Sequence, residues 1–214
     1  MSYLFFALII LSFSNYNFFF VYLTRTKTIF EILISSTMRL FVAVDIPINT
    51  EIEGVMSYVK KAGKVKAVEK ENLHITLKFL GEVSDDKLSD IKNCIESSCK
   101  NFKKFSIKLK GFGAFPSLSK PRVIWIGVDE GKDILSEIMR RLDECFHQMG
   151  FKKEKSYVPH ITIARVKGFI RFDPRPYLKK DFGSVIIEEI KLKKSQLTPK
   201  GPIYDDIFVL ELQE

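Results

Sequence analysis

Two short segments with the same residue pattern, one in each half of the chain, constrain the fold most strongly. The first reads Leu-His-Ile-Thr-Leu at 73–77 and the second reads Pro-His-Ile-Thr-Ile at 159–163. In a β-strand, residues i and i+2 face the same way, so each segment places a histidine and a threonine on one face and apolar residues on the other. The repetition indicates a duplicated architecture with two similar lobes, although the halves are too different overall to count as a sequence repeat.

The rest of the chain from Met38 onward alternates between strand and helix periodicity. Asn49 and Ser84 are candidate N-caps, and Gly150 is a candidate helix end. The pattern predicts helices over 51–63, 85–100 and 132–150, and strands over 39–46, 73–83, 105–115, 122–128, 158–166, 182–197 and 206–214. Because strands and helices are interleaved but also follow one another directly, this order favours an α+β fold.

The N-terminal segment differs from this pattern. Residues 1–24 carry no charge and are long enough for a membrane span, but serines and asparagines interrupt the middle of the segment. Two explanations remain open for residues 1–37: a mis-assigned start upstream of Met38, or a membrane anchor. Arg25 and Lys27 follow the apolar segment, so an anchor would leave the rest in the cytoplasm. We expect one domain over 38–214.

Composition excludes several classes of protein. The chain is 46% hydrophobic and carries a net charge of +8, which excludes wholesale disorder and describes a basic globular protein. Its three cysteines lack metal-ligand spacing, which argues against a disulfide framework and a zinc ribbon. We therefore expect free thiols and a cytoplasmic location, with no interaction with membranes unless residues 1–37 form a real anchor.

The paired His-x-Thr pattern suits one type of chemistry. A single copy is more often a packed histidine in a sheet, but two of the three histidines precede a threonine by two residues, which is a specific signal. One imidazole can accept a proton while the other donates one, and two hydroxyls can bind the oxygens of a phosphodiester. No metal is needed for this scheme, and two histidines without carboxylates or cysteines at ligand spacing make a poor zinc site.

These segments carry a resemblance to a known family. The stretches LHITLKFLGEV (73–83) and VPHITIARVK (158–167) resemble the paired HxTx signature of the 2H phosphoesterase superfamily, and are most similar to its RNA 2′,3′-cyclic phosphodiesterase branch, also called the 2′-5′ RNA ligase family. RLFVAVDIP, which follows Met38, and LTPKGPIYDDIFVLEL (197–212) extend the resemblance to the C-terminus. It implies a bilobal, pseudo-symmetric fold in which two antiparallel sheets, flanked by helices, enclose a central cleft.

The resemblance also implies a function. The expected reaction is hydrolysis of RNA 2′,3′-cyclic phosphate ends to 2′-phosphomonoesters without a metal or cofactor, with 2′-5′ ligation possible in vitro. His74 would be the proton donor and His160 the proton acceptor, and Thr76 and Thr162 would bind phosphate. The residues alone leave open which histidine is the acid. We expect a monomer whose partner is RNA with a 2′,3′-cyclic phosphate terminus.

Further residues are candidates for binding the substrate. Lys78 continues the face of His74 and Thr76 by alternation and could contact phosphate. Arg165 would bind phosphate only if a bulge or twist brought it round to the face of Thr162. Phe79 and Phe115 could stack a terminal base, although core packing is the more frequent role of a phenylalanine in a chain so rich in this residue.

Two alternatives to the RNA phosphodiesterase remain. One is a non-catalytic RNA-binding module that retains the cleft. The other is a phosphodiesterase that acts on a small cyclic nucleotide.

Overall fold

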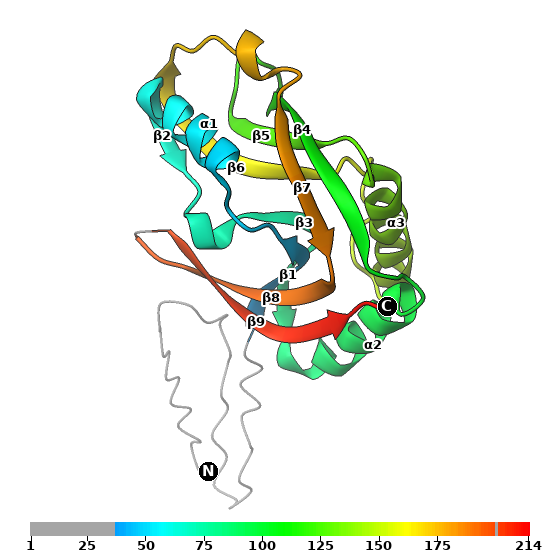
Figure 1. Cartoon of the computed structure of the whole chain (residues 1–214). Coiled ribbons are helices and arrows are strands. Elements are labelled where there is room, and N and C mark those ends of the chain that lie inside the picture. The colour runs from blue at the N-terminus through cyan, green and yellow to red at the C-terminus, as the bar shows by residue number, and fades with distance from the viewer. Residues whose placement is uncertain (1–36, 200) are drawn as a thin grey trace, which may run out of the picture. The chain divides into compact units, whose positions relative to one another are not determined.

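Strands dominate the part of the chain that the computed structural model describes, residues 37–199 and 201–214 (Figure 1). The helices are α1 (Thr50–Lys61), α2 (Leu88–Cys99) and α3 (Lys132–Gln148). The strands are β1 (Thr37–Asp45), β2 (Gly63–Ala67), β3 (His74–Ser84), β4 (Phe105–Phe115), β5 (Val123–Val128), β6 (His160–Ile170), β7 (Asp181–Ile187), β8 (Glu189–Leu197) and β9 (Pro202–Glu211).

The strands form two groups that meet at one point. Their order is β7-β4-β5-β6-β3-β1-β8-β9, with β2 paired to β6, and all of these pairs are antiparallel. The other neighbours pair along several residues, whereas β3 and β6 pair only at Ile75↔Ile161. One lobe therefore contains β1, β3, β8 and β9, and the other contains β2, β4, β5, β6 and β7. The predicted two-lobed α+β architecture is confirmed.

The two strands with the His-x-Thr pattern occupy equivalent positions in the two lobes. β3 follows β1 after α1, the short strand β2 and a 3₁₀ turn, and pairs with β1, so that Asp45 lies opposite His74. β6 follows β5 after one helix and pairs with it, and Gly127 lies opposite His160. Each motif therefore begins at the same corner of an equivalent strand pair, as the repeated pattern predicts.

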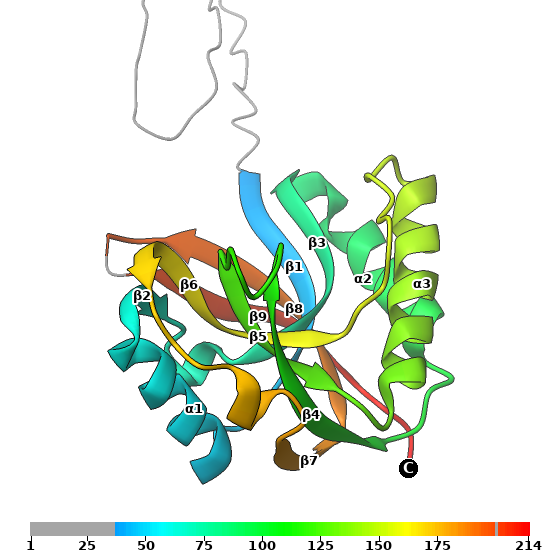
Figure 2. The ribbon, with the colours of Figure 1, turned by 90° about the horizontal axis from the view of Figure 1, so that it is seen from above.

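Each lobe is covered by a helix from the other half of the chain. α1 follows β1 but packs on β2 and β6 of the second lobe. α3 follows β5 but packs on β3 and on α2, on the side of the first lobe. Figure 2 shows α1 at the opposite end of the strands from α2 and α3. Because the helices cross over, neither half can bury its apolar faces without the other.

Most helix boundaries agree with the sequence. The side chain of Asn49 accepts a hydrogen bond from the backbone N–H of Ile52 at 2.9 Å and caps α1, as predicted. α3 is followed by Gly150, whose φ of +89° is a left-handed conformation that glycine adopts without strain. The predicted cap at Ser84 is wrong, because Ser84 is the last residue of β3 and its side chain makes no capping bond. A short 3₁₀ turn separates Ser84 from α2.

Two other expectations need correction. The predicted strand over 182–197 is two strands, β7 and β8, which break at Glu188 and join different lobes. Cys94 of α2 and Cys145 of α3 were expected to be separate thiols, but they form a disulfide whose Cα atoms lie 6.0 Å apart. Cys99 is a buried free thiol.

The predicted extension over residues 1–37 lies, apart from Thr37, outside the described residues. Its separation from a domain over 38–214 therefore stays a prediction. Among the residues that the structure describes, no helix combines the length and the apolar character required to span a membrane.

Candidate active site

The two His-x-Thr segments lie side by side where the lobes meet. Ile75 and Ile161, which pair across β3 and β6, are both 0% exposed on the apolar face. The flanking residues His74, Thr76, His160 and Thr162 are half-buried on the other face. We call these four residues the HxT cluster.

The antiparallel register sets the geometry of the HxT cluster. Because Ile75 lies opposite Ile161, His74 lies beside Thr162 and Thr76 lies beside His160. The two histidines are then diagonal neighbours, which lie about 7–8 Å apart in an antiparallel sheet. This spacing leaves room for one phosphate between two imidazole rings.

Both rings are oriented by the same hydrogen bond. Nδ1 of His74 lies 2.7 Å from the carbonyl oxygen of Asn72, and Nδ1 of His160 lies 2.7 Å from that of Val158. A carbonyl oxygen can only accept, so Nδ1 carries the hydrogen in both rings and Nε2 is the nitrogen left for chemistry. Nε2 of His74 lies 3.1 Å from Oγ1 of Thr76, within the cluster.

His74 has a shifted pKa. Burial lowers it from 6.5, and the charges of Lys193 and His160 act in the same direction, against the bond to Asn72 and the charge of Asp45. The contribution of His160 means that the two rings are close enough for the charge on one to affect protonation of the other. In the absence of substrate, the neutral form of His74 is therefore favoured at pH 7.

Aromatic rings surround the two histidines differently. The His74 ring lies 5.1 Å from that of Phe41 and 5.4 Å from that of Tyr204, measured between centroids. The His160 ring lies 5.1 Å from Phe115 and 6.1 Å from Trp125. Each histidine ring therefore packs against aromatic rings of its own lobe.

A β-bulge follows each motif. The pairing of β3 with β1 shifts between Thr76 and Lys78, and the pairing of β6 with β5 shifts between Thr162 and Ala164. Each bulge adds one residue and exchanges the faces of the residues that follow. As a result, the sequence of burial is the same from His74 to Phe79 as from His160 to Arg165: half-buried, buried, half-buried, buried, buried, exposed.

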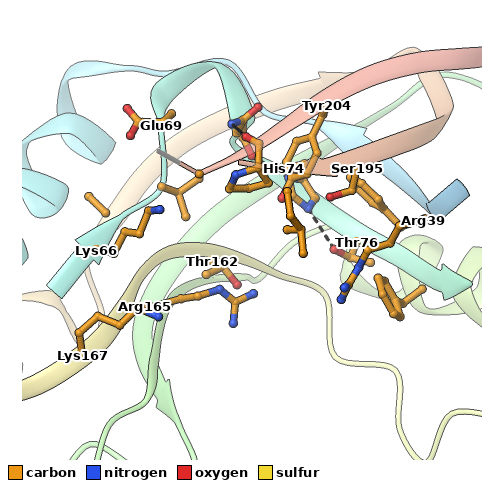
Figure 3. A pocket seen from close by; sticks show the side chains of 18 residues that line it. Arg39, Lys66, Glu69, His74, Thr76, Thr162, Arg165, Lys167, Ser195 and Tyr204 are labelled. Atoms are coloured by element: carbon orange, nitrogen blue, oxygen red, sulfur yellow. Dashed lines mark hydrogen bonds between the residues drawn. The ribbon is translucent and has the colours of Figure 1, made fainter. Parts of the chain in front are cut away.

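The bulges decide which later residues reach the site. Arg165 lines a cavity beside Thr162, because the bulge turns its side chain to the same face as Thr162 (Figure 3). Phe79, its equivalent in the other lobe, also lines the cavity; the guanidinium carbon of Arg39 lies 5.0 Å from the centre of its ring. Phe115, the other base-stacking candidate, lies beside His160.

The prediction for Lys78 is wrong for the same reason. The bulge turns its side chain away from His74 and into the protein, where the residue is only 2% exposed. Its Nζ donates to Oδ1 of Asp143 at 2.6 Å and to the carbonyl oxygen of Lys152 at 2.6 Å. Lys78 therefore does not face the cavity.

Asp143 connects the two active-site strands. Besides Lys78, which lies just after the first motif, it accepts a hydrogen bond from the hydroxyl of Tyr157 at 2.7 Å, just before the second. The backbone N–H of Glu154 also donates to it, at 3.1 Å from Oδ1. Burial acts to raise the pKa of Asp143, but these hydrogen bonds and the charge of Lys78 hold it below its ordinary value. The carboxylate thus stays ionised and paired.

A basic cavity of about 480 Å³ is lined by three members of the HxT cluster, His74, Thr76 and Thr162 (Figure 3). Its lining contains four cationic side chains and a single carboxylate: Arg39, Lys66, Arg165, Lys167 and Glu69. The β8–β9 hairpin forms a further wall with Ser195 and Tyr204. Such a lining attracts a polyanion.

Sequence reasoning missed several of these lining residues. Arg39 and Phe41 share a face of β1 by alternation, a signal that was available within RLFVAVDI. Tyr204 lies in the C-terminal segment of the resemblance, but no local pattern separates it from the other polar residues of that hairpin. Among residues 37–199 and 201–214, no group of three or more histidines, cysteines and carboxylates could hold a metal ion.

Comparison with known proteins agrees with this geometry. Residues 46–172 match the model of the 2′-5′ RNA ligase superfamily. A protein of Methanocaldococcus jannaschii named RNA 2′,3′-cyclic phosphodiesterase is 48% identical over 79% of this chain and 98% of its own length. Its namesake in Methanothermobacter thermautotrophicus is 40% identical over 82% of this chain and 99% of its own length.

Solved structures show the same fold. The crystal structure of TT0787 of Thermus thermophilus has a TM-score of 0.73 and 27% identity, covering 82% of this chain and 98% of that one. The apo form of E. coli LigT has a TM-score of 0.66 and 25% identity, covering 84% of this chain and all of that one. The chain belongs to the 2′-5′ RNA ligase superfamily.

Proposed function

We propose that this protein hydrolyses 2′,3′-cyclic phosphate ends of RNA to 2′-phosphomonoesters. The curated relatives bear the name of this activity, and the chain shares their family. The observation that carries the proposal is the HxT cluster, in which two imidazoles and two hydroxyls share one face around the Ile75–Ile161 pair.

The cluster supplies each group that the reaction needs. Water attacks phosphorus from the side of His160, whose Nε2 accepts the proton of the water. His74 donates a proton from Nε2 to the departing O3′ as the P–O3′ bond breaks, and the phosphate stays on O2′. The hydroxyls of Thr76 and Thr162 donate hydrogen bonds to the non-bridging oxygens, where negative charge develops.

This assignment requires substrate to change the protonation of His74. Burial lowers the pKa of the free ring, whereas a proton donor must carry its proton when the reaction begins. A bound phosphodiester places a negative charge beside the ring, which favours the protonated form and offsets the effect of burial. His74 therefore takes up its proton as substrate binds.

Arg165 and the other cations of the basic cavity bind the RNA. The guanidinium of Arg165 points into the cavity beside Thr162, where it can contact the cyclic phosphate or the preceding one (Figure 3). The cavity is larger than one phosphate requires, so the chain before the terminal nucleotide can lie along Lys66 and Lys167.

The test is hydrolysis of an oligonucleotide with a 2′,3′-cyclic phosphate end in the presence of EDTA. Turnover is expected to persist in EDTA and to fall by about 10²–10⁴ in His74→Ala and in His160→Ala. The exposed third histidine provides a matched control, and His147→Ala is expected to be as active as the unmodified protein.

Each alternative gives a different result. Full activity in both active-site variants would contradict the proposal, and salt-dependent RNA binding without turnover would indicate a non-catalytic module. Equal or faster turnover of a mononucleoside cyclic phosphate would indicate a small cyclic nucleotide as the substrate.

We also propose that the domain starts at Met38 and that the protein acts in the cytoplasm. The protein of M. jannaschii is matched over 98% of its own length by 79% of this chain, which fits a domain shorter than the full sequence. Intact mass of the native protein gives the test: a mass that begins at Met38 supports this proposal, and one that includes residues 1–37 in a membrane fraction contradicts it.

A further inference from the structure

An aromatic surface lies beside His160, and neither of its two rings lines the basic cavity. The rings of Phe115 and Trp125 lie 5.4 Å apart between centroids at an angle of 35°, and the His160 ring stands edge-on to Phe115 at 5.1 Å. Phe115 is 38% exposed, which is unusual for a large aromatic residue in a strand. We call Phe115 and Trp125 the aromatic platform.

Trp125, but not Phe115, lines a second cavity of about 400 Å³. Trp125 lines it together with glycines of β4 and β5, the start of α3 and the segment before His160; these residues include Gly111, Gly127, Lys132, Ser136, Tyr157, Val158 and Pro159. The two cavities share no lining residue, and His160 lines neither, but its neighbours in sequence do: Pro159 lines the second cavity and Thr162 the basic one. We call this second cavity the glycine groove.

Glycine at position 113 makes room for the ring of Trp125, which lines the groove. A Cβ atom at Gly113 would lie 2.1 Å from the Trp125 ring, so only glycine lets the indole lie across β4. The indole N–H of Trp125 is buried and has no hydrogen-bond partner among the described residues, so packing alone holds the ring. The result is a broad π-surface within reach of the reacting centre.

This surface has the chemistry to bind a nucleoside. Nucleobases stack on aromatic rings without regard to sequence. The exposed side chain of Lys132 puts positive charge at the edge of the groove, where the charge of Lys110 is already paired with Asp129 at 2.8 Å. A base on the platform would thus have a cation nearby for a phosphate that follows it.

We propose that the aromatic platform and glycine groove bind a second nucleoside, whose 5′-hydroxyl replaces water beside His160. This inference rests on the proposed function, because it uses the same two histidines. The nucleophile enters from the side of His160, and the platform contacts that ring directly. The cyclic end occupies the basic cavity at the same time.

The step balances without any other reactant. The 5′-oxygen attacks phosphorus, so that a P–O5′ bond forms as the P–O3′ bond breaks. His160 accepts the proton of the 5′-hydroxyl, and His74 gives one to O3′. The product is a 2′–5′ phosphodiester with a free 3′-hydroxyl, and the reverse reaction cleaves that linkage.

Binding is tested first, without turnover. Trp125 is the only tryptophan in the chain, so its fluorescence reports on the platform. With the basic cavity saturated by adenosine 2′-phosphate, added adenosine is expected to quench this fluorescence saturably, and Phe115→Ala is expected to weaken its binding about tenfold. Absence of a second quenching phase would overturn the inference even if hydrolysis is normal.

The second test measures how the cyclic end divides between hydrolysis and ligation. An RNA with a cyclic end reacts with water and with a 5′-hydroxyl oligonucleotide in the same mixture. Both reactions use His74 and His160, so the ratio of 2′–5′-ligated to hydrolysed product isolates the acceptor. Trp125→Leu is expected to lower this ratio about tenfold. Phe169→Ala, at a position that is 83% exposed and outside both cavities, is expected to leave it unchanged.

The outcomes separate this inference from the function on which it rests. Hydrolysis without ligated product at any acceptor concentration, or a ratio unaffected by Trp125→Leu, overturns the acceptor site and leaves the phosphodiesterase intact. Loss of both products in the unmodified protein overturns the phosphodiesterase, and the acceptor role with it.

Discussion

His74 and His160 make the same hydrogen bond but have different electrostatic surroundings. Each donates Nδ1–H to the carbonyl oxygen two residues earlier, so the reactive nitrogen is the same in both. His74 also lies near Asp45, Lys193 and the aromatic rings of Phe41 and Tyr204. Two rings of identical chemistry can divide the roles of acid and base only if their surroundings separate their proton affinities.

This difference gives a prediction for the pH dependence. Because burial lowers the pKa of free His74 and a proton donor must be protonated, the descending limb of kcat/KM is expected to lie at lower pH than it would for a donor histidine of ordinary pKa. In the complex, the phosphate raises that pKa, so the same fall in kcat is expected at higher pH. The measurement is kcat and kcat/KM from about pH 4.5 to 9 with a cyclic-phosphate oligonucleotide.

The substitution Asp45→Asn identifies the limb that belongs to His74. The charge of Asp45 raises the pKa of His74, so its removal lowers that pKa further. With His74 as the donor, the descending limb of kcat/KM moves to lower pH and the ascending limb stays in place. Movement of the ascending limb instead would show that His74 is the acceptor and that the two roles must be exchanged.

The threonines provide a second prediction at the scale of single residues. Valine has the shape of threonine but no hydroxyl, so Thr76→Val and Thr162→Val each remove one hydrogen bond to the phosphate. Loss of one such donor is expected to lower kcat by about 10²–10³ with the thermal unfolding temperature nearly unchanged. Thr50→Val, at the exposed first residue of α1, is the control. Unchanged turnover in both active-site variants would remove the hydroxyls from the mechanism.

At the scale of elements, the sequence predicted the strands but not their bulges. Regular alternation assigned Lys78 to the face of His74 and Arg165 to the opposite face from Thr162. A single added residue after each threonine reverses both assignments. A bulge arises from pairing with a neighbouring strand, and residues that lie within one strand carry no signal for it.

The buried pair of Lys78 and Asp143 gives a prediction at this scale. Asp143 contacts β3 through Lys78 and the segment before β6 through Tyr157, so it is a positioning residue for both motifs. Lys78→Met leaves Asp143 buried without its cation and is expected to cost about 3–5 kcal/mol of unfolding free energy. The double variant Lys78→Met/Asp143→Leu removes both charges and is expected to recover most of this loss.

Activity of the double variant separates positioning from stability. If the hydrogen bonds among Lys78, Asp143 and Tyr157 hold the two histidines in position, kcat is expected to stay about tenfold low in the refolded double variant, with little change in KM. We call these three residues the network. Return of kcat together with stability would mean that the network is only structural. Lys60→Met, an exposed position on α1, controls for the loss of a lysine.

At the scale of the whole molecule, the basic cavity draws on distant parts of the chain. Arg39 comes from β1, Lys66 from β2, Arg165 from β6 and Tyr204 from β9. Net charge and the paired motifs could be obtained from the sequence, and both pointed to RNA. The sequence could not show which cations line the cavity, because this depends on helices α1 and α3 crossing between the lobes.

The position of these cations predicts how salt affects activity. Lys167 lines the basic cavity beyond Arg165, away from the HxT cluster, so it would contact RNA before the terminal nucleotide. Lys167→Gln is expected to raise KM several-fold for a cyclic-phosphate oligonucleotide and to leave KM for the mononucleoside cyclic phosphate unchanged. The slope of log KM against log salt is expected to fall by about 0.7, the value for one contact with a single strand.

An equal change of charge elsewhere distinguishes a local contact from the field of the whole protein. Lys100→Gln, at an exposed position after α2 and outside the basic cavity, removes the same charge. Long-range steering alone would make the two variants equivalent, since it depends on net charge. A larger effect of Lys167→Gln on KM, limited to the oligonucleotide, would mean that RNA lies along β6. Equal effects on KM for the oligonucleotide and the mononucleoside cyclic phosphate would mean that only the terminal nucleotide is bound.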